Sequence, residues 1–273
     1  MPDVWTAVTE LDGLTQQRLA DVLETRGADQ QQQALRASFL GDIAFPKHSR
    51  VLDVGCGTGV LTRKLASLAN VESVTGVDPA PSLLKRAREL AKNLPGVSFR
   101  EADGRSLPFD AASYDVVVFD STLSHVTAPE QALAEAFRVL RPSGWLAAFD
   151  GDYATTTVAL RDNDPLQTCV DAMMASSVHD RWVMRKVSAL ARDCGFESIR
   201  FRSHGFVETT GSAYMLSVID RGADILRASG RIGEELAAGL KAEARRRREA
   251  GMFFGHIAYA SLTARKHSGS DVR

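Results

Sequence analysis

The sequence predicts an α/β fold: a doubly wound, mostly parallel seven-stranded sheet with N-terminal helices and a helical cap inserted late in the chain. Short apolar segments alternate with helical patterns five times over the first 150 residues, as expected for parallel strands joined by right-handed crossovers. The segment YDVVVF at residues 114–119 is apolar throughout, as a strand buried on both faces must be. Three glycines, Gly55, Gly57 and Gly59, follow the first strand, where such sheets bind ligands.

The first half of the chain accounts for five of the predicted strands. Apolar residues at helical spacing between residues 15 and 40 predict two helices with a break near Gly27. Further helices are predicted over residues 59–68, over a segment that Ser82 can cap, and over residues 129–139. The five predicted strands are residues 50–54, 73–77, 97–101, 114–119 and 145–149.

The second half is less regular and supplies the cap. Two late strands are predicted at residues 198–207 and 256–264, and the helical segments are residues 166–177, 183–194, 213–228 and 232–250. No linker-like composition separates this half, so residues 1–273 are predicted to form a single domain. Its predicted parts are N-terminal helices (1–45), a cofactor-binding core (46–152), acceptor-binding insertions around the late strand (153–252) and a final strand (253–266).

Composition restricts the class of partner. The 33 Lys and Arg residues balance 34 Asp and Glu, which leaves a formal charge of −1 and no field to attract nucleic acid or an anionic membrane. No segment approaches the roughly 20 apolar residues that cross a bilayer. The three cysteines are widely scattered, which favours a reducing cytoplasm and no metal site. We therefore expect a cytoplasmic protein, monomeric or homodimeric, that acts on a small molecule.

The glycine-rich turn is the strongest functional signal. Glycines without Cβ atoms let a ligand lie against the main chain. A dinucleotide site has the spacing G-x-G-x-x-G, with an acidic residue about 20 positions later. This chain has G-x-G-x-G, with Asp53 ahead of the turn and Asp78 at the end of the second strand. An NAD(P)-dependent oxidoreductase remains an alternative, although no Tyr-x-x-x-Lys pair accompanies the turn.

Several segments together resemble the class I S-adenosylmethionine-dependent methyltransferases, in particular the small-molecule branch that includes the quinone-biosynthesis enzymes. VLDVGCGTG is similar to the first motif of that family, and VTGVDPAPSLLKRAREL is similar to the second. The resemblance continues through residue 152 and returns in HIAYASLTARK. It implies the Rossmann-like methyltransferase fold, S-adenosylmethionine as cofactor, and methyl transfer to O, C or N of a small, largely apolar metabolite. A non-methylating cyclase or binding protein with the same pocket is a further alternative.

The resemblance also implies roles for individual residues. The methionine arm and ribose of the cofactor would lie against the glycine turn, Asp53 would hold the amino acid end, and Asp78 would accept both ribose hydroxyls. Asp103 would accept from the adenine amino group. The full set of implied cofactor-binding residues is Asp53, Gly55, Cys56, Gly57, Gly59, Asp78, Pro79, Ala102, Asp103, Gly104, Phe119, Asp120 and Ser121.

The acceptor side gives weaker signals. His125 in STLSHV matches a histidine of the family and is the candidate general base, while a structural role in its loop is the alternative. The candidate acceptor-binding residues are Asp150, Asp152, Arg185, Tyr214 and Phe254. Strand-end turns, surface charges and ordinary core packing explain these five residues equally well.

Overall fold

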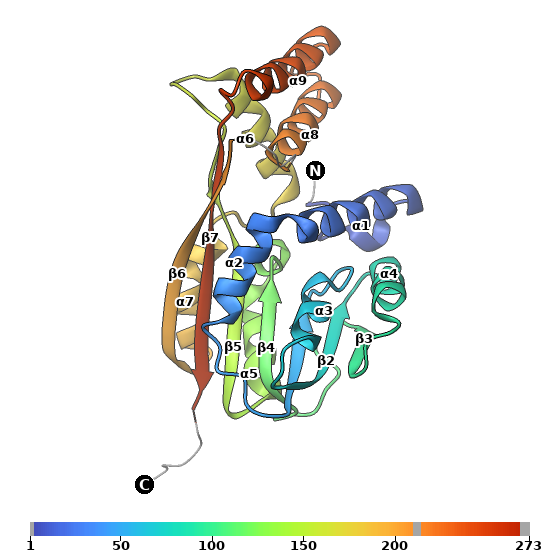
Figure 1. Cartoon of the computed structure of the whole chain (residues 1–273), viewed down its shortest axis with the longest axis vertical. Coiled ribbons are helices and arrows are strands. Elements are labelled where there is room, and N and C mark those ends of the chain that lie inside the picture. Colours follow the sequence, from blue (N-terminus) through green and yellow to red (C-terminus); the bar gives the residue numbers. More distant parts are fainter. Residues whose placement is uncertain (1–2, 210–213, 268–273) are drawn as a thin grey trace.

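The computed structural model describes residues 3–209 and 214–267, which form one twisted sheet with helices on both faces (Figure 1). The strand order is β3-β2-β1-β4-β5-β7-β6, and it reverses between β1 and β4. The doubly wound seven-stranded fold predicted from the sequence is confirmed. The strands are β1 (Ser49–Val54), β2 (Val71–Asp78), β3 (Val97–Glu101), β4 (Tyr114–Asp120), β5 (Leu140–Thr157), β6 (Phe196–Glu208) and β7 (Gly255–Lys266).

Pairing between strands sets where the site lies. The first five strands pair in parallel, with Asp53 of β1 beside Val118 of β4 and Gly76 of β2. The last strand, β7, runs antiparallel between β5 and β6. Since the order reverses at β1 and β4, the helices that follow these strands leave on opposite faces, and a crevice opens at the carboxyl ends of both strands.

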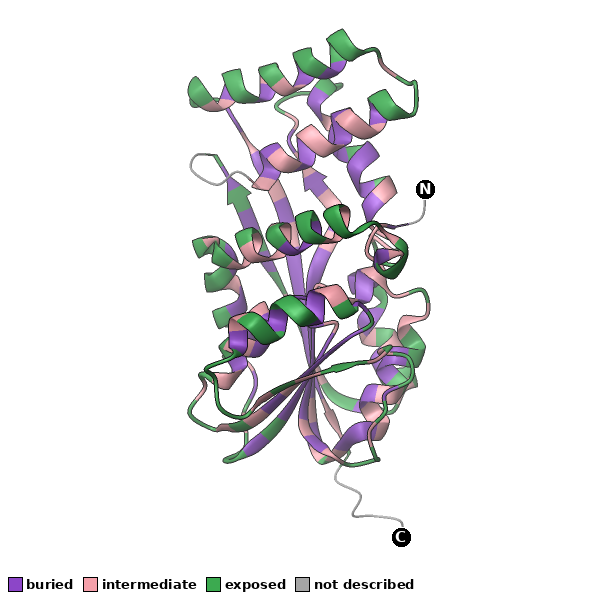
Figure 2. Cartoon of the chain, turned by 90° about the vertical axis from the view of Figure 1, so that its right-hand side faces the viewer, coloured by how far each residue is buried: buried purple, intermediate pink, exposed green. Residues whose placement is uncertain are grey.

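Each face of the sheet has its own hydrophobic core because side chains alternate along the strands. Val51 and Val116 pack on one face with α2 (Gln30–Leu40) and α3 (Val60–Ala66). Leu52 and Val117 pack on the other face with α5 (Pro129–Val139) and α7 (Val183–Asp193). Figure 2 shows the strands buried between helices that expose their outer surfaces.

The N-termini of the helices have the capping residues and prolines that their sequences favour, except that α4 is not capped by Ser82. Asp12 caps α1 (Gly13–Ala28) by accepting from the backbone N–H groups of Leu14 and Thr15. Proline occupies the first turn of α4 (Pro81–Ala91) and of α5. The prediction that Ser82 caps α4 was wrong, because the helix already begins at Pro81 and Ala80 is the capping position.

The helical cap stands on the long strands at the end of the sheet. The helices α6 (Pro165–Ser177), α8 (Tyr214–Ala228) and α9 (Glu234–Glu249) pack together beyond the ends of the long strands β5, β6 and β7 (Figure 1). The expectation that the fifth strand ends at residue 149 was wrong. Pairing with β7 extends β5 through Asp150 and Asp152 to Thr157, so these aspartates lie within a strand. No helix in the described part of the chain is long and apolar enough to cross a membrane.

Candidate active site

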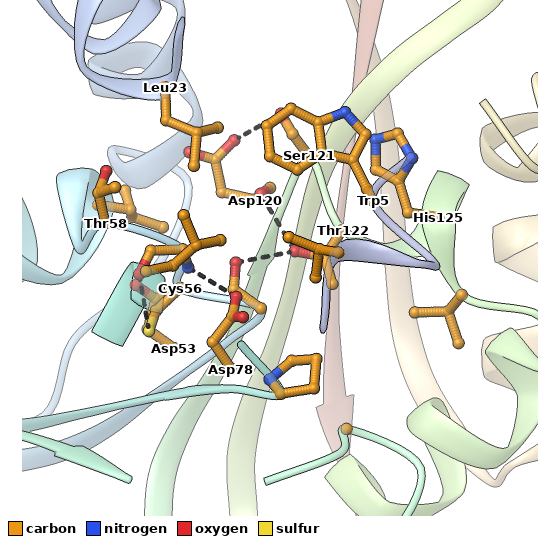
Figure 3. A pocket seen from close by; sticks show the side chains of 18 of the residues that line it. Trp5, Leu23, Asp53, Cys56, Thr58, Asp78, Asp120, Ser121, Thr122 and His125 are labelled. Carbon is orange, nitrogen blue, oxygen red and sulfur yellow. Dashed lines mark hydrogen bonds between the residues drawn. The ribbon is translucent and has the colours of Figure 1, made fainter. Parts of the chain in front are cut away.

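A cavity of about 360 Å³ opens at the carboxyl ends of β1, β2 and β4 (Figure 3). This volume is within the range of small-molecule sites. Its floor is the glycine turn after β1, and Trp5 and Leu23 from the start of the chain and from α1 lie over it. The residues of the sequence-predicted cofactor set that line it are Asp53, Gly55, Cys56, Gly57, Asp78, Pro79, Asp103, Gly104, Asp120 and Ser121. Gly59, Ala102 and Phe119, the other three residues of that set, do not line the cavity.

The glycine turn has a backbone that only glycine adopts easily. Gly55 and Gly57 have φ angles of 73° and 51°, in the left-handed region. A Cβ atom on Gly55 would come within 2.3 Å of the Thr122 side chain, and one on Gly57 within 2.8 Å of Leu23. The turn is therefore enclosed by β4 and α1, and a ligand meets main chain there. Burial raises the pKa of the Cys56 thiol, which keeps it protonated beside the turn.

Asp78 is organised as a hydrogen-bond acceptor at the end of β2. Its Oδ2 accepts from the Gly57 backbone N–H and its Oδ1 from the Ala80 N–H, both at 2.9 Å. Each carboxylate oxygen has two lone-pair sites, so each retains one after these bonds. Burial raises the pKa of Asp78 to about 6. The carboxylate can thus accept two further hydrogen bonds from a ligand in the cavity.

Asp53 lies below the turn and is 1% exposed. Its Oδ2 accepts from the Thr62 hydroxyl at 2.6 Å. Burial is the main cause that raises the pKa of Asp53 to about 7, and the charges of Asp120 and Asp78 add to it. A cationic ligand group nearby would favour the ionised form.

Asp103 occupies the outer rim of the cavity. Both of its carboxylate oxygens accept from the Arg105 guanidinium, with the shortest contact at 2.6 Å, and this hydrogen bonding lowers the pKa of Asp103. Arg105 also donates to the Thr127 hydroxyl at 2.8 Å. This exposed ion pair fixes the rim at the outer end of the cavity.

Two arginines that sequence reasoning missed enter the cavity from the N-terminal helices. Arg36 on α2 donates from Nε to Oδ2 of Asp120 at 2.5 Å, and its Nη1 is buried without a hydrogen-bond partner among the described residues. Arg26 on α1 donates from Nη2 to the Ser121 hydroxyl. Ser121 has a φ of 56°, and strained backbone of this kind is concentrated at functional sites. The end of β4 is therefore flanked by two guanidinium groups.

His125 lines the same cavity and has a carboxylate partner. Its Nδ1 lies 2.6 Å from Oδ2 of Asp3, whose side chain is 2% exposed. The Thr6 hydroxyl donates to the His125 backbone carbonyl at 2.9 Å. No hydrogen bond engages Nε2 within residues 3–209 and 214–267. A carboxylate on one ring nitrogen with the other nitrogen available is the arrangement that orients a histidine base.

The five candidate acceptor residues do not line this cavity. Asp150 is buried and accepts from the Ser124 backbone N–H at 3.0 Å, and burial raises its pKa. Asp152 pairs at 2.9 Å with Arg185, whose side chain is half exposed. Tyr214, at the start of α8, packs edge-on against Phe206 of β6, and Phe254 stacks on His256.

The missed residues come from the first 36 positions. Asp3, Trp5, Arg26 and Arg36 carry no motif, and the sequence placed their segment only as helices. Their one signal was position on the helix, since Arg26 follows Leu19 and Leu23, which pack against Ala80 and Leu83. The Glu24 side chain of the same helix accepts from the Thr58 hydroxyl on the glycine turn at 2.5 Å.

Comparison with known proteins agrees with this geometry. The family described as "Methyltransferase domain" matches residues 52–148, from β1 to β5. A demethylmenaquinone methyltransferase of Tropheryma whipplei is 28% identical over 57% of this chain and 70% of its own length. An uncharacterized 37.1 kDa protein in a transposon of Streptomyces fradiae is 34% identical over 53% of this chain, and the match spans only 42% of that protein.

Solved structures share the fold over nearly the whole chain. The [4+2]-cyclase SpnF superposes with a TM-score of 0.60 and 22% identity, covering 98% of this chain and 99% of its own. YcgJ from Bacillus subtilis gives a TM-score of 0.59 at 18% identity, covering 85% and 98%. At these identities the likeness concerns the fold. Residues 52–148 thus match a methyltransferase domain, and this segment is similar in sequence to enzymes named as quinone-biosynthesis methyltransferases.

Proposed function

We propose that the protein binds S-adenosylmethionine in this cavity and transfers a methyl group to oxygen, carbon or nitrogen of a small-molecule acceptor. The observation that carries the proposal is Asp78, which holds two unused lone-pair sites beside a turn without side chains. A ribose presents two adjacent hydroxyl donors and fits this pair of acceptors. Pro79 and Gly104 leave the neighbouring wall free for a flat base, which Asp103 at the rim would bind.

The amino acid end of the cofactor fits the opposite end of the cavity. Its ammonium group would lie near the carboxylates of Asp53 and Asp120, and the charge of Asp120 contributes to the raised pKa of Asp53. Its carboxylate would satisfy Nη1 of Arg36, which is buried and has no partner in the described chain. Arg36 and Asp120 already form an ion pair with each other. The cofactor's carboxylate would therefore meet the Arg36 guanidinium, and its ammonium group would meet the Asp120 carboxylate.

The main task of the protein in this reaction is to position the acceptor against the methyl group. When bound, S-adenosylmethionine supplies an electrophilic methyl group and its own leaving group. The protein aligns the acceptor and excludes water, which is the usual source of rate in such reactions. Where the acceptor atom carries a proton, His125 accepts it on Nε2 while Asp3 stabilises the resulting imidazolium through Nδ1.

Calorimetry with S-adenosylmethionine, S-adenosylhomocysteine and NADH tests the cofactor. We expect heat with the first two compounds and none with NADH, and the reverse pattern would support the oxidoreductase alternative. Incubation with methyl-labelled S-adenosylmethionine and a metabolite extract tests catalysis. A product heavier by one methylene group supports transfer, whereas binding without any labelled product supports a cyclase or binding protein.

A further inference from the structure

The segment before α1 forms part of the wall of the cofactor cavity. We call residues 3–11 the N-terminal strap. The strap residues that line the cavity are Trp5, Thr6, Val8 and Thr9. Figure 3 shows the Trp5 side chain next to His125, and 6.0 Å separates the centroids of the two rings. A ligand in the cavity therefore has the strap as a neighbour in addition to the glycine turn.

Along most of its length, the strap is held by neutral hydrogen bonds and one small apolar cluster. Val8 is 3% exposed and packs with Ala80 and with Leu83 of α4. Nε2 of Gln16, on α1, donates to the backbone carbonyl of Val8 at 2.9 Å and to that of Leu11 at 3.0 Å. Hydrogen bonds between neutral groups contribute little to stability individually. A segment held in this way can open at a lower free energy than the whole fold does.

The helix α1 is fixed more firmly than the strap. The Glu24 carboxylate on α1 accepts from the Thr58 hydroxyl at 2.5 Å and from the Arg63 guanidinium at 2.8 Å. Thr58 belongs to the glycine turn and Arg63 to α3, so these contacts join α1 to the cofactor site. At the junction of the strap and α1 lie Asp12 and Gly13, which are both exposed, and a Cβ atom on Gly13 would meet no atom within 4 Å. The strap can therefore pivot at residues 12–13 while α1 stays on the glycine turn.

The strap also supplies the carboxylate that orients His125. Oδ2 of Asp3 lies 2.6 Å from Nδ1 of His125 and accepts from the His179 backbone N–H at 2.9 Å. Oδ1 of Asp3 accepts from the Trp5 backbone N–H at 2.9 Å, so the carboxylate is also fixed within the strap. An ionised carboxylate only accepts hydrogen bonds, so in the neutral imidazole Nδ1 carries the proton and Nε2 does not. His125 loses this partner whenever the strap moves away.

We propose that the strap opens to admit the cofactor, closes over it, and by closing completes the methyl-transfer site. The inference rests on the proposed function and concerns the same cavity. With the strap closed, Trp5 covers the cavity beside His125, and Asp3 holds the imidazole with Nε2 as its basic nitrogen. With the strap open, the cofactor can leave and the imidazole has no fixed tautomer. Closure of this kind ties the assembly of a base to the enclosure of the reactants.

The test compares Gln16→Ala with Gln17→Ala in the full chain. Gln16→Ala removes both hydrogen bonds from α1 to the strap, and Gln16 does not line the cavity. Gln17 is an exposed residue of the same type at the next position, and Ala favours the helix at both sites.

Nitrogen-15 NMR of histidine-labelled, ligand-free protein at about pH 9, where imidazoles are neutral, reports the tautomer of His125. The signals of His125 are those that are absent from His125→Asn. We expect Gln16→Ala to lower the population of the Nδ1–H tautomer by about a third, because the strap opens more often, and Gln17→Ala to leave it unchanged.

The rate at which S-adenosylhomocysteine dissociates is then measured by stopped flow. Dissociation should be about fivefold faster from Gln16→Ala than from the original protein, since two neutral hydrogen bonds no longer oppose opening, and unchanged in Gln17→Ala. Saturation with S-adenosylhomocysteine should also restore the Nδ1–H tautomer of His125 in Gln16→Ala, because a ligand that the strap encloses favours the closed state.

Either of two results overturns the proposal. One is the same His125 tautomer in Gln16→Ala and Gln17→Ala, since closure of the strap would then not orient the histidine. The other is the same dissociation rate from both variants, since the strap would then not enclose the ligand. If S-adenosylhomocysteine does not bind the original protein at all, the proposed function fails. The tautomer comparison, which needs no ligand, then decides by itself whether the strap orients His125.

Discussion

Replacement of Asp78 by Asn tests the proposed contact with the ribose. The carboxylate accepts one backbone hydrogen bond on each oxygen, from Gly57 and from Ala80, and the proposed function uses the remaining lone pairs for the ribose hydroxyls. Asn keeps the size of the side chain and one acceptor oxygen. It removes the charge and turns an N–H donor toward one of the two backbone N–H groups.

The magnitude follows from the number of contacts. Hydrogen bonds to a charged group contribute about 1.5–3 kcal/mol each. Two hydroxyl contacts that lose their charged partner therefore cost about 3 kcal/mol, because weaker neutral contacts partly replace them. A cost of that size corresponds to roughly a 100-fold increase in the dissociation constant of S-adenosylhomocysteine. The control is Glu89→Gln, an exposed change on α4 that should leave the affinity unchanged.

Calorimetry with 2′-deoxy S-adenosylhomocysteine distinguishes a lost ribose contact from a distorted turn. The deoxy compound should bind the original protein at least tenfold more weakly than S-adenosylhomocysteine, and it should bind Asp78→Asn nearly as well as the full nucleoside does. The reasoning is refuted if folded Asp78→Asn binds S-adenosylhomocysteine within threefold of the original protein. It is also refuted if removal of the 2′-hydroxyl costs the same factor in both proteins.

Three further predictions follow from the cavity. His125→Asn should lower kcat at least 100-fold with an oxygen or nitrogen acceptor, while cofactor affinity stays within threefold. Asp3→Asn should lower kcat less and shift the pH profile of the reaction. A loss of cofactor affinity in His125→Asn as large as its loss of kcat would instead make His125 structural. Gly57→Ala places a side chain at a φ of 51° against Leu23, so thermal unfolding should show a loss of about 1–2 kcal/mol, and unchanged stability would contradict the described turn. The pKa of Asp53 is about 7 in the folded protein, against an ordinary value of 3.8 for this side chain. Its contribution to stability is therefore fully present below about pH 4 and is lost as the pH rises through 7. In the ligand-free protein Asp53→Asn should therefore gain stability over the original from pH 5 to pH 8, by on the order of 4 kcal/mol at most, and a difference that does not vary with pH would count against this burial.

The cofactor half of the fold could be predicted because its signals are local. Asp78 ends an apolar segment and precedes a proline, and Gly57 lies in a turn whose spacing is visible in five residues. Both therefore appear in the sequence at the positions where the structure brings them together. The helix break near Gly27 is equally local: α1 ends at Ala28 and α2 begins at Gln30.

The remaining contacts of the site could not be predicted because the residues that make them are distant in sequence. Asp3 meets His125 across 122 residues, and Arg36 meets Asp120 across 84. The length of β5 depends on pairing with β7, which lies more than 100 residues later, so Asp150 was expected at a strand end and lies inside a strand. No pattern within a short window carries such information.

The placement of α8 and α9 between β6 and β7 has a consequence for how such a protein can diversify. The two strands pair antiparallel with each other along their whole length, and β7 also pairs with β5, so their register does not depend on the helices that connect them. Insertions, deletions or replacements in the connecting helices can therefore change the surface above the long strands without moving the glycine turn. Selection can act on this one contiguous stretch of the gene while the segment that encodes the glycine turn stays as it is.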